Sequence, residues 1–123
     1  MQYKTITIKV DRNMATTIIT TDKMTAVRAS AISQIIGNDA IAASKALLIE
    51  EAKRQMTNGI CHFVFKKKDG SIAERFGTLN PALCSQHVKG TGRSPEKSGC
   101  TCYWDVEKSG FRAFLWENII TIL

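Results

Sequence analysis

The last 24 residues of the chain, 100–123, constrain its fold most strongly. They contain both tryptophans of the sequence and three further aromatic residues, in two runs separated by the polar segment 107–110. Runs of aromatic and β-branched residues on either side of a short turn with a glycine are typical of a β-hairpin. Because aromatic side chains fill much of a small core, we expect this hairpin to lie at the centre of a β-rich domain.

A second predicted hairpin precedes this one. Apolar and polar residues alternate over 60–66 and again over 71–79, and Asp69-Gly70 lies between the two runs. Asp-Gly between alternating runs is a strong hairpin signal. Together with a short strand at the end of the chain, the two hairpins give five strands. This number of short strands with tight connections predicts a small antiparallel barrel of the SH3-like type.

The N-terminal part of the chain has a different pattern. Alternation over 1–10 and a β-prone run over 15–20 predict two short strands. From Asp22 onward the spacing of apolar residues becomes helical, which predicts helices over 22–36 and 40–57.

The period of the pattern changes at Ile60, and this change divides the chain. We expect an α+β fold in which an N-terminal strand and two-helix extension, residues 1–59, precedes an SH3-like antiparallel β-barrel, residues 60–123. The chain has no apolar run of about 18 residues and no apolar block at its start, so we expect neither a membrane span nor a secretory signal. Four cysteines without such a signal predict a reducing, cytoplasmic location.

The charge is positive but spread along the chain. There are 17 basic and 11 acidic residues, and the halves 1–59 and 60–123 contribute +3 each to the net charge of +6. A duplex-DNA binder usually concentrates its positive charge on one face. The excess therefore permits contact with an acidic partner without requiring it.

Two basic groups are candidates for binding. The long segment 80–99 contains three glycines and two prolines, and it carries Lys89 and Arg93. Long segments without predicted structure in a small domain are often functional. The second group, Lys66, Lys67 and Lys68, precedes the turn of the first barrel hairpin, where lysines also commonly serve only solubility.

Four residues near this segment have a spacing that fits a metal site. Cys84 and His87 form a Cys-x2-His pair, and Cys100 and Cys102 form a Cys-x-Cys pair, with twelve residues between the two pairs. Thiolates and imidazole are the ligands that tetrahedral zinc prefers. Alternatively, Cys100 and Cys102 pack as small apolar side chains on one face of a strand. Zinc is thus one hypothesis, and no other cofactor is expected.

Catalysis has little support in the sequence. Cys61 and His62 are neighbours in a predicted strand and point to opposite faces, and no acid evidently orients the His87 side chain near Cys84. The glycines at 90 and 92 precede no predicted helix, so they do not form a phosphate-binding motif. We therefore predict that the protein is not an enzyme.

Five short motifs follow one another in residues 60–123. They are Phe65-Lys-Lys-Lys-Asp-Gly-Ser-Ile, Gly77-Thr-Leu-Asn-Pro81, Lys89-Gly-Thr-Gly-Arg93, Tyr103-Trp-Asp-Val-Glu-Lys-Ser-Gly-Phe-Arg-Ala-Phe114 and Glu117-Asn-Ile-Ile. In this order they resemble a family of small SH3 β-barrel proteins of unknown function, encoded by gut anaerobes, their phages and mobile elements. The resemblance covers about half of the chain.

The final hairpin also resembles the end of WYL domains, in Phe-Arg-Ala-Phe at 111–114 and the motif that begins at Glu117. Such domains are Sm/SH3-like barrels that bind nucleic acids or nucleotides and regulate transcription or defence systems. The resemblance implies that Arg112 helps to form a ligand surface, although Leu115 stands where a second basic residue is expected. Alternatively, Arg112 pairs with Asp105 or Glu107 across the hairpin.

Two functions are compatible with these features. The first is a non-enzymatic regulatory barrel that binds nucleic acid or a nucleotide, with basic side chains for phosphate and aromatic rings for base stacking. The second is a phage or mobile-element factor that binds a host protein. The resemblance favours the first, and the sequence does not indicate an oligomeric state. The expected ligand-binding residues are Lys66, Lys67, Lys68, Lys89, Arg93, Arg112, Tyr103 and Trp104.

Overall fold

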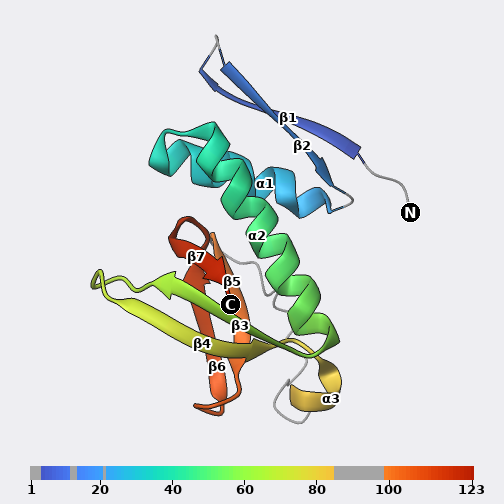
Figure 1. Cartoon of the computed structure of the whole chain (residues 1–123), viewed down its shortest axis with the longest axis vertical. Helices are drawn as coiled ribbons and strands as arrows, with labels where there is room; N and C mark the ends of the chain where they lie inside the picture. Colours follow the sequence, from blue (N-terminus) through green and yellow to red (C-terminus); the bar gives the residue numbers. More distant parts are fainter. Residues whose placement is uncertain (1–3, 12–13, 21, 85–98) are drawn as a thin grey trace.

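The computed structural model describes residues 4–11, 14–20, 22–84 and 99–123, and its elements form three layers (Figure 1). A two-stranded hairpin lies on one side of two helices, and a strongly twisted five-stranded sheet lies on the other side. In chain order the elements are β1 (Lys4–Asp11), β2 (Met14–Thr20), α1 (Lys23–Ile36), α2 (Asp39–Asn58), β3 (Ile60–Lys66), β4 (Ile72–Thr78), α3 (Pro81–Cys84), β5 (Cys100–Asp105), β6 (Gly110–Leu115), the 3-10 turn η2 (Trp116–Asn118) and β7 (Ile119–Ile122).

The helices α1 and α2 begin and end at capping residues. The Asp22 side chain accepts a hydrogen bond of 2.9 Å from the backbone N–H of Met24, and Asn38 accepts one of the same length from Ile41. Each bond satisfies an N–H group that the first turn of a helix leaves without a partner. Helix α1 ends at Gly37, whose φ of 70° is left-handed and favours glycine. Both helices lie where the sequence predicts them.

The five strands predicted in the C-terminal half are all present. Their order in the sheet is β6-β5-β4-β3-β7, and all neighbours are antiparallel. The sheet therefore consists of two hairpins placed side by side, with β7 returning to the free edge of β3. The 3-10 turn η2 between β6 and β7 was not predicted.

The sequence predicts a segment without regular structure over residues 80–99, but its first part, Pro81–Cys84, is helical. The Asn80 side chain accepts a hydrogen bond of 2.8 Å from the Ala82 N–H, and its carbonyl accepts one of 2.9 Å from Leu83. These bonds, with a proline at the first helical position, form the single turn of α3. Residues 85–98, which include His87, Lys89 and Arg93, lie outside the described residues.

The core of the sheet is aromatic. Cys61, Phe63 and Phe65 alternate along β3 and face the interior. The Phe63 ring packs edge-on against Tyr103, with centroids 5.0 Å apart, and lies 5.4 Å from the Phe114 ring. These side chains come from both hairpins, so the core holds the two hairpins together.

Helix α2 closes the interior of the sheet and is hydrogen-bonded to it near both ends. Lys45 Nζ donates to the carbonyls of Glu117 and Ile119 at 2.8 and 2.7 Å. Near the C-terminal end, the Thr78 hydroxyl donates to the carbonyl of Gly59 at 2.6 Å. The helix and the sheet therefore pack as one unit, and the division of the chain into residues 1–59 and 60–123 stays a prediction.

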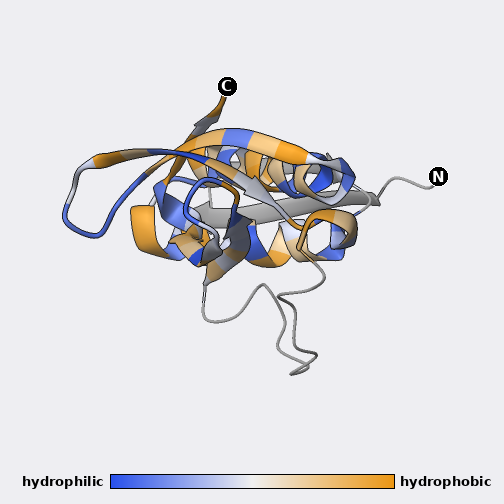
Figure 2. Cartoon of the chain, turned by 90° about the horizontal axis from the view of Figure 1, so that it is seen from below, coloured by the Kyte–Doolittle hydropathy of each residue, from blue (hydrophilic) through white to orange (hydrophobic). Residues whose placement is uncertain are grey.

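The surface is hydrophilic at the β3–β4 turn, which projects from the body of the molecule (Figure 2). Within the described part of the chain, none of the helices combines the length and the apolar character needed to cross a membrane.

Candidate functional site

Asp105, the last residue of β5, is a carboxylate with no exposed surface. In the sheet register it lies opposite Gly77 of β4 on one side and Gly110 of β6 on the other. Neither neighbour has a side chain, so longer side chains two residues away on each strand have room to reach Asp105 diagonally. Those side chains are Arg75 and Arg112.

Both arginines form ion pairs with the same oxygen of Asp105. Arg112 Nε lies 3.3 Å from Asp105 Oδ2, and Arg75 Nε lies 3.7 Å from it. The Arg75 side chain is 21% exposed and the Arg112 side chain 49% exposed. Two guanidinium groups thus share one negative charge, and the site keeps a net positive charge that reaches solvent through Arg112.

The other oxygen of Asp105 holds the turn between β5 and β6. Oδ1 accepts hydrogen bonds of 3.0 Å from the backbone N–H groups of both Glu107 and Lys108. A carboxylate fixed by two backbone bonds and by burial cannot move away from the arginines easily. Asp105 therefore positions both guanidinium groups, and we call Arg75, Asp105 and Arg112 the arginine site.

The arginine site is not saturated with hydrogen bonds. Among the described residues, Asp105 Oδ2 accepts no hydrogen bond, and the buried Tyr103 hydroxyl has no partner. Burial raises the pKa of Tyr103 to about 12, and the neighbouring charge of Asp105 acts in the same direction. Arg75 Nη1 donates a hydrogen bond of 3.0 Å to the Glu74 carbonyl. The half-exposed fork of Arg112 is therefore the one best placed for a two-bond contact with an oxyanion.

Of the predicted ligand-binding residues, Tyr103 and Trp104 are corrected by the structure. Tyr103 has no exposed surface because it packs against Phe63 in the core, and Trp104 is 8% exposed because it packs against Phe111 at a centroid distance of 5.0 Å. Neither ring can stack on a base. The exposed aromatic residue of this hairpin is Phe111, with 51% of its surface in solvent.

Arg112 lies as the alternative interpretation of the sequence expected, paired with Asp105 across the hairpin. The pair differs from that interpretation in one respect, because Asp105 is buried rather than exposed. Arg75 and Asp105 were not predicted as site residues. The alternation along β4 and β5 could have predicted that both side chains lie on the inner face of the sheet. No local sequence signal specifies how β4 pairs with β5, so the contact between the two residues could not be predicted.

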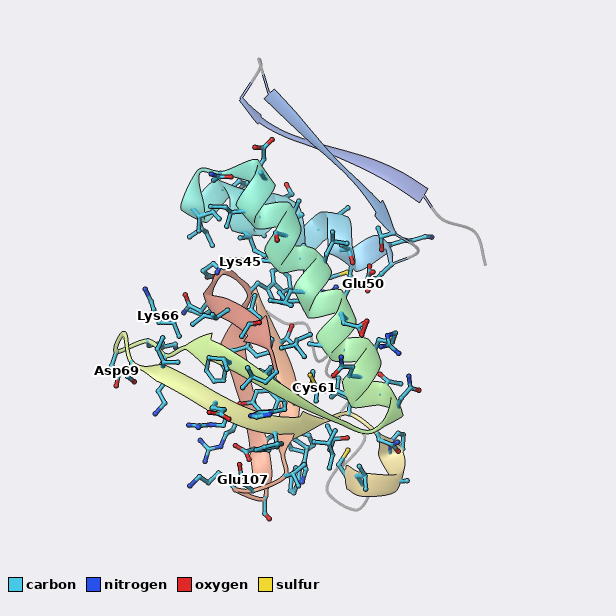
Figure 3. All side chains as sticks on the ribbon, in the orientation of Figure 1. Lys45, Glu50, Cys61, Lys66, Asp69 and Glu107 are labelled. Atoms are coloured by element: carbon cyan, nitrogen blue, oxygen red, sulfur yellow. The ribbon has the colours of Figure 1, made fainter. Side chains whose placement is uncertain are left out.

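The other predicted basic residues are divided between the described and the undescribed parts of the chain. Lys66, Lys67 and Lys68 are exposed where β3 ends and the turn begins (Figure 3). Lys89 and Arg93 lie outside the described residues, so their predicted place beside Arg112 stays a prediction.

The predicted zinc ligands are similarly divided. Cys84 is buried in α3, where its thiol donates to the Asn80 carbonyl at 3.3 Å, and Cys100 and Cys102 are half-buried on β5. In residues 4–11, 14–20, 22–84 and 99–123, no three Cys, His, Asp or Glu side chains are grouped so that they could hold a metal ion. His87 lies outside these ranges. The structure thus gives the zinc hypothesis no support, and it stays a prediction.

The helix α2 and the two hairpins define the class of the protein as a small antiparallel barrel of the SH3 type. Residues 49–120 match a family model described as WYL_2, with an Sm-like SH3 beta-barrel fold, and the chain belongs to this family. The match confirms the SH3-like fold and the WYL-like character predicted from the sequence, and it is consistent with a non-enzymatic module. Neither the comparison with curated proteins nor the comparison with solved structures returned a match.

Proposed function

We propose that this protein is a non-enzymatic module that binds nucleic acid or a nucleotide, and that Arg112 and Arg75 contact phosphate. The observation that carries the proposal is the sharing of one buried carboxylate oxygen by two arginines at distances of 3.3 and 3.7 Å. The arrangement holds the guanidinium groups in place before a ligand arrives, so less conformational entropy is lost on binding.

The chemistry of the site supports an oxyanion as the ligand. A guanidinium fork matches the geometry of phosphate oxygens, and the half-exposed Arg112 reaches solvent. Phe111 precedes it on the edge strand β6 and is half exposed, but neighbouring residues of a strand point to opposite faces, so the proposal depends on phosphate contact and not on base stacking. The net charge of +6 adds a general attraction for polyanions.

The resemblance of the last hairpin to WYL domains supports the same proposal. It implies a role for Arg112 in a ligand surface, and those domains bind nucleic acids or nucleotides. Fold and family alone do not establish a ligand, so the proposal depends on the arginine site and on its test.

A second candidate function, a protein-interaction factor, is favoured by a different observation. Val27, Ile35 and Ile41 on the helices α1 and α2 each expose about half or more of their surface, at 52%, 66% and 49%. An exposed apolar patch is typical of a protein contact, and these three side chains are the candidates for one on the helices. This function predicts a bound partner that is insensitive to nucleic acid and to changes at Arg112.

The two functions are separated by fluorescence anisotropy with labelled single-stranded DNA and RNA, measured at low and moderate salt. We expect wild-type protein to bind, and we expect affinity to fall with salt because phosphate contacts release counterions. Arg112→Gln should weaken binding by about tenfold, the typical effect of losing one charge-assisted hydrogen bond. Arg75→Gln should weaken it in the same direction.

Arg54→Gln is the matched control. It removes the same charge from an exposed arginine that pairs with Glu51 on helix α2 and belongs to neither hairpin of the sheet. We expect its affinity to stay near that of the wild type. Absence of binding at low salt would reject the nucleic-acid function, and equal binding by the Arg112→Gln and Arg54→Gln proteins would reject the arginine site.

A further inference from the structure

A cavity of about 140 Å³ lies at the end of strand β3, separate from the arginine site. Its lining residues include Lys66, Lys67 and Lys68, and also Asn118 in η2. Its remaining walls are mainly apolar and include Phe65. We call this the lysine cavity. It is much smaller than the roughly 300–1,000 Å³ that a drug-sized ligand occupies.

The positive charge around the lysine cavity is not neutralised locally. Among the residues that the structure describes, none of the three lysines forms an ion pair, and no acidic side chain lines the cavity. Two acids neighbour lining residues in the sequence: Glu117, which precedes Asn118, and Asp69, at the turn (Figure 3). The Asp69 carboxylate accepts hydrogen bonds from the N–H and the hydroxyl of Ser71 at 2.9 and 2.6 Å, and it therefore serves the turn.

A fourth lysine adds to the positive potential. Lys45 donates to the carbonyls of Glu117 and Ile119, which flank Asn118, and so fixes the turn that carries this lining residue. Burial lowers the pKa of Lys45, the charge of Glu117 raises it, and the charge of Lys66 lowers it. Lys45 does not line the cavity, but its charge acts on Lys66, and an anion in the cavity would offset the positive potential of both.

We propose that the lysine cavity binds one tetrahedral oxyanion of phosphate size, either inorganic phosphate or the phosphate group of a nucleotide. The apolar floor lowers the local dielectric constant and strengthens the attraction between the ammonium groups and the anion. The side-chain amide of Asn118 adds a hydrogen-bond donor. The volume accommodates a phosphate group. This site does not depend on the proposed function of Arg75 and Arg112.

The test is a set of NMR titrations of the full chain with inorganic phosphate, adenosine monophosphate and adenosine. We expect inorganic phosphate or the monophosphate to give saturable shifts of the backbone amides of Ala113, Leu115 and Asn118, which line the cavity. Adenosine should give none at the same concentrations. Binding of both phosphates assigns the cavity to any phosphate group, whereas binding of inorganic phosphate alone assigns it to the free ion.

The triple variant Lys66→Gln/Lys67→Gln/Lys68→Gln should weaken this binding by about tenfold or more. The matched control is Lys23→Gln/Lys53→Gln/Lys108→Gln, which removes three charges outside the cavity. The affinity of this control for phosphate should stay within about threefold of the wild type, because only the net charge of the protein has changed.

Three results would overturn the inference. The first is an absence of saturable shifts at the cavity amides with either phosphate, and the second is an equal loss of affinity in both triple variants. The third is an equal response to adenosine. The titration measures phosphate binding at the lysine cavity, and the variants leave Arg75 and Arg112 intact. A negative result would therefore reject the lysine cavity as a phosphate site without bearing on oligonucleotide binding at the arginine site.

Discussion

The Nε atom of Arg112 lies 3.3 Å from Oδ2 of Asp105, so a half-exposed guanidinium is anchored on a carboxylate that has no exposed surface. An exposed ion pair typically contributes about 0–1 kcal/mol. Here the carboxylate is buried, and removing a partner of a buried charge costs considerably more than the pair contributes. Arg75 and Arg112 therefore stabilise Asp105, and Asp105 in return positions the arginines.

The first prediction concerns Asp105→Asn. The amide oxygen can still accept the hydrogen bonds from Glu107 and Lys108, so the turn is retained. The negative charge is lost, and Arg75 and Arg112 then face each other without compensation. We expect the free energy of unfolding to fall by about 1–3 kcal/mol, below the full cost of a buried pair because Arg112 is half exposed. Urea denaturation measures it, with Glu107→Gln as a neighbouring exposed control.

An Asp105→Asn protein as stable as the Glu107→Gln protein would show that the shared carboxylate contributes little to stability. The arginines would then be held by other contacts, and the argument for their positioning would fail.

The second prediction concerns Gly77, which lies opposite Asp105 in the sheet. A Cβ atom at this position would lie 2.7 Å from Tyr103 Cδ2 and 2.9 Å from Phe63 Cε1. Both rings are fully buried and cannot move away without disturbing the core. We expect Gly77→Ala to lower the free energy of unfolding by about 1–3 kcal/mol or more.

The control for this substitution is Gly59→Ala, because a Cβ atom there would meet no atom within 4 Å. Its effect should stay within about 0.5 kcal/mol. Equal stabilities of the two variants in thermal or urea denaturation would contradict the tight packing of Phe63, Gly77 and Tyr103.

Much of the fold was predictable because its signals are local. The helical caps, the Asp69-Gly70 turn and the change of period at Ile60 each depend on neighbouring residues, and the helices and strands lie where these signals place them. Trp116–Asn118 and Pro81–Cys84 were missed because single helical turns are shorter than the window over which periodicity can be recognised.

The arginine site was only partly predictable because it depends on non-local pairing. Arg112 was found through a motif, but its partner Arg75 comes from the other hairpin, across the long segment 80–99. The inner face of β5 was also misjudged. Tyr103 and Trp104 are adjacent and amphipathic, and alternation alone does not show that both are buried, Tyr103 against Phe63 and Trp104 against Phe111.

The third prediction concerns the alkaline stability of the protein. The pKa of Tyr103 is raised from 10.0 to about 12. Between these values the unfolded state has lost the phenolic proton and the folded state retains it, so stability falls as pH rises. Tyr103→Phe removes this effect. The measured quantity is the free energy of unfolding of the wild type minus that of this variant. We expect this difference to fall by about 1 kcal/mol between about pH 8 and about pH 11.

The same substitution tests the unpaired hydroxyl. Among the described residues it has no hydrogen-bond partner, so its removal should leave stability at neutral pH unchanged or slightly higher. The pKa of Cys61 is also raised, to about 11, but this thiol is present in both proteins and cancels in the comparison. A constant difference between the two proteins across this range would contradict the raised pKa of Tyr103.

The last prediction concerns Glu50, which connects the N-terminal elements to helix α2 (Figure 3). Its Oε1 atom accepts hydrogen bonds from the hydroxyls of Thr20 in β2 and Thr25 in α1, the second at 2.6 Å. Both threonines are buried. Their hydroxyls connect β2 and α1 to the same carboxylate on α2. Hydrogen bonds to a charged group contribute about 1.5–3 kcal/mol, more than neutral ones.

We therefore expect Thr25→Val, which keeps the shape of the side chain and removes the hydroxyl, to lower the free energy of unfolding by about 1–3 kcal/mol. Thr57→Val is the matched control, since the exposed Thr57 hydroxyl donates to a carbonyl within its own helix, that of Lys53 at 2.8 Å. Hydrogen exchange adds a local readout: the amides of α1 should lose more protection in Thr25→Val than those of β3 and β4. Equal stabilities of the two valine variants, or uniform loss of protection, would mean that the packing of apolar side chains, not Glu50, holds α1 on α2.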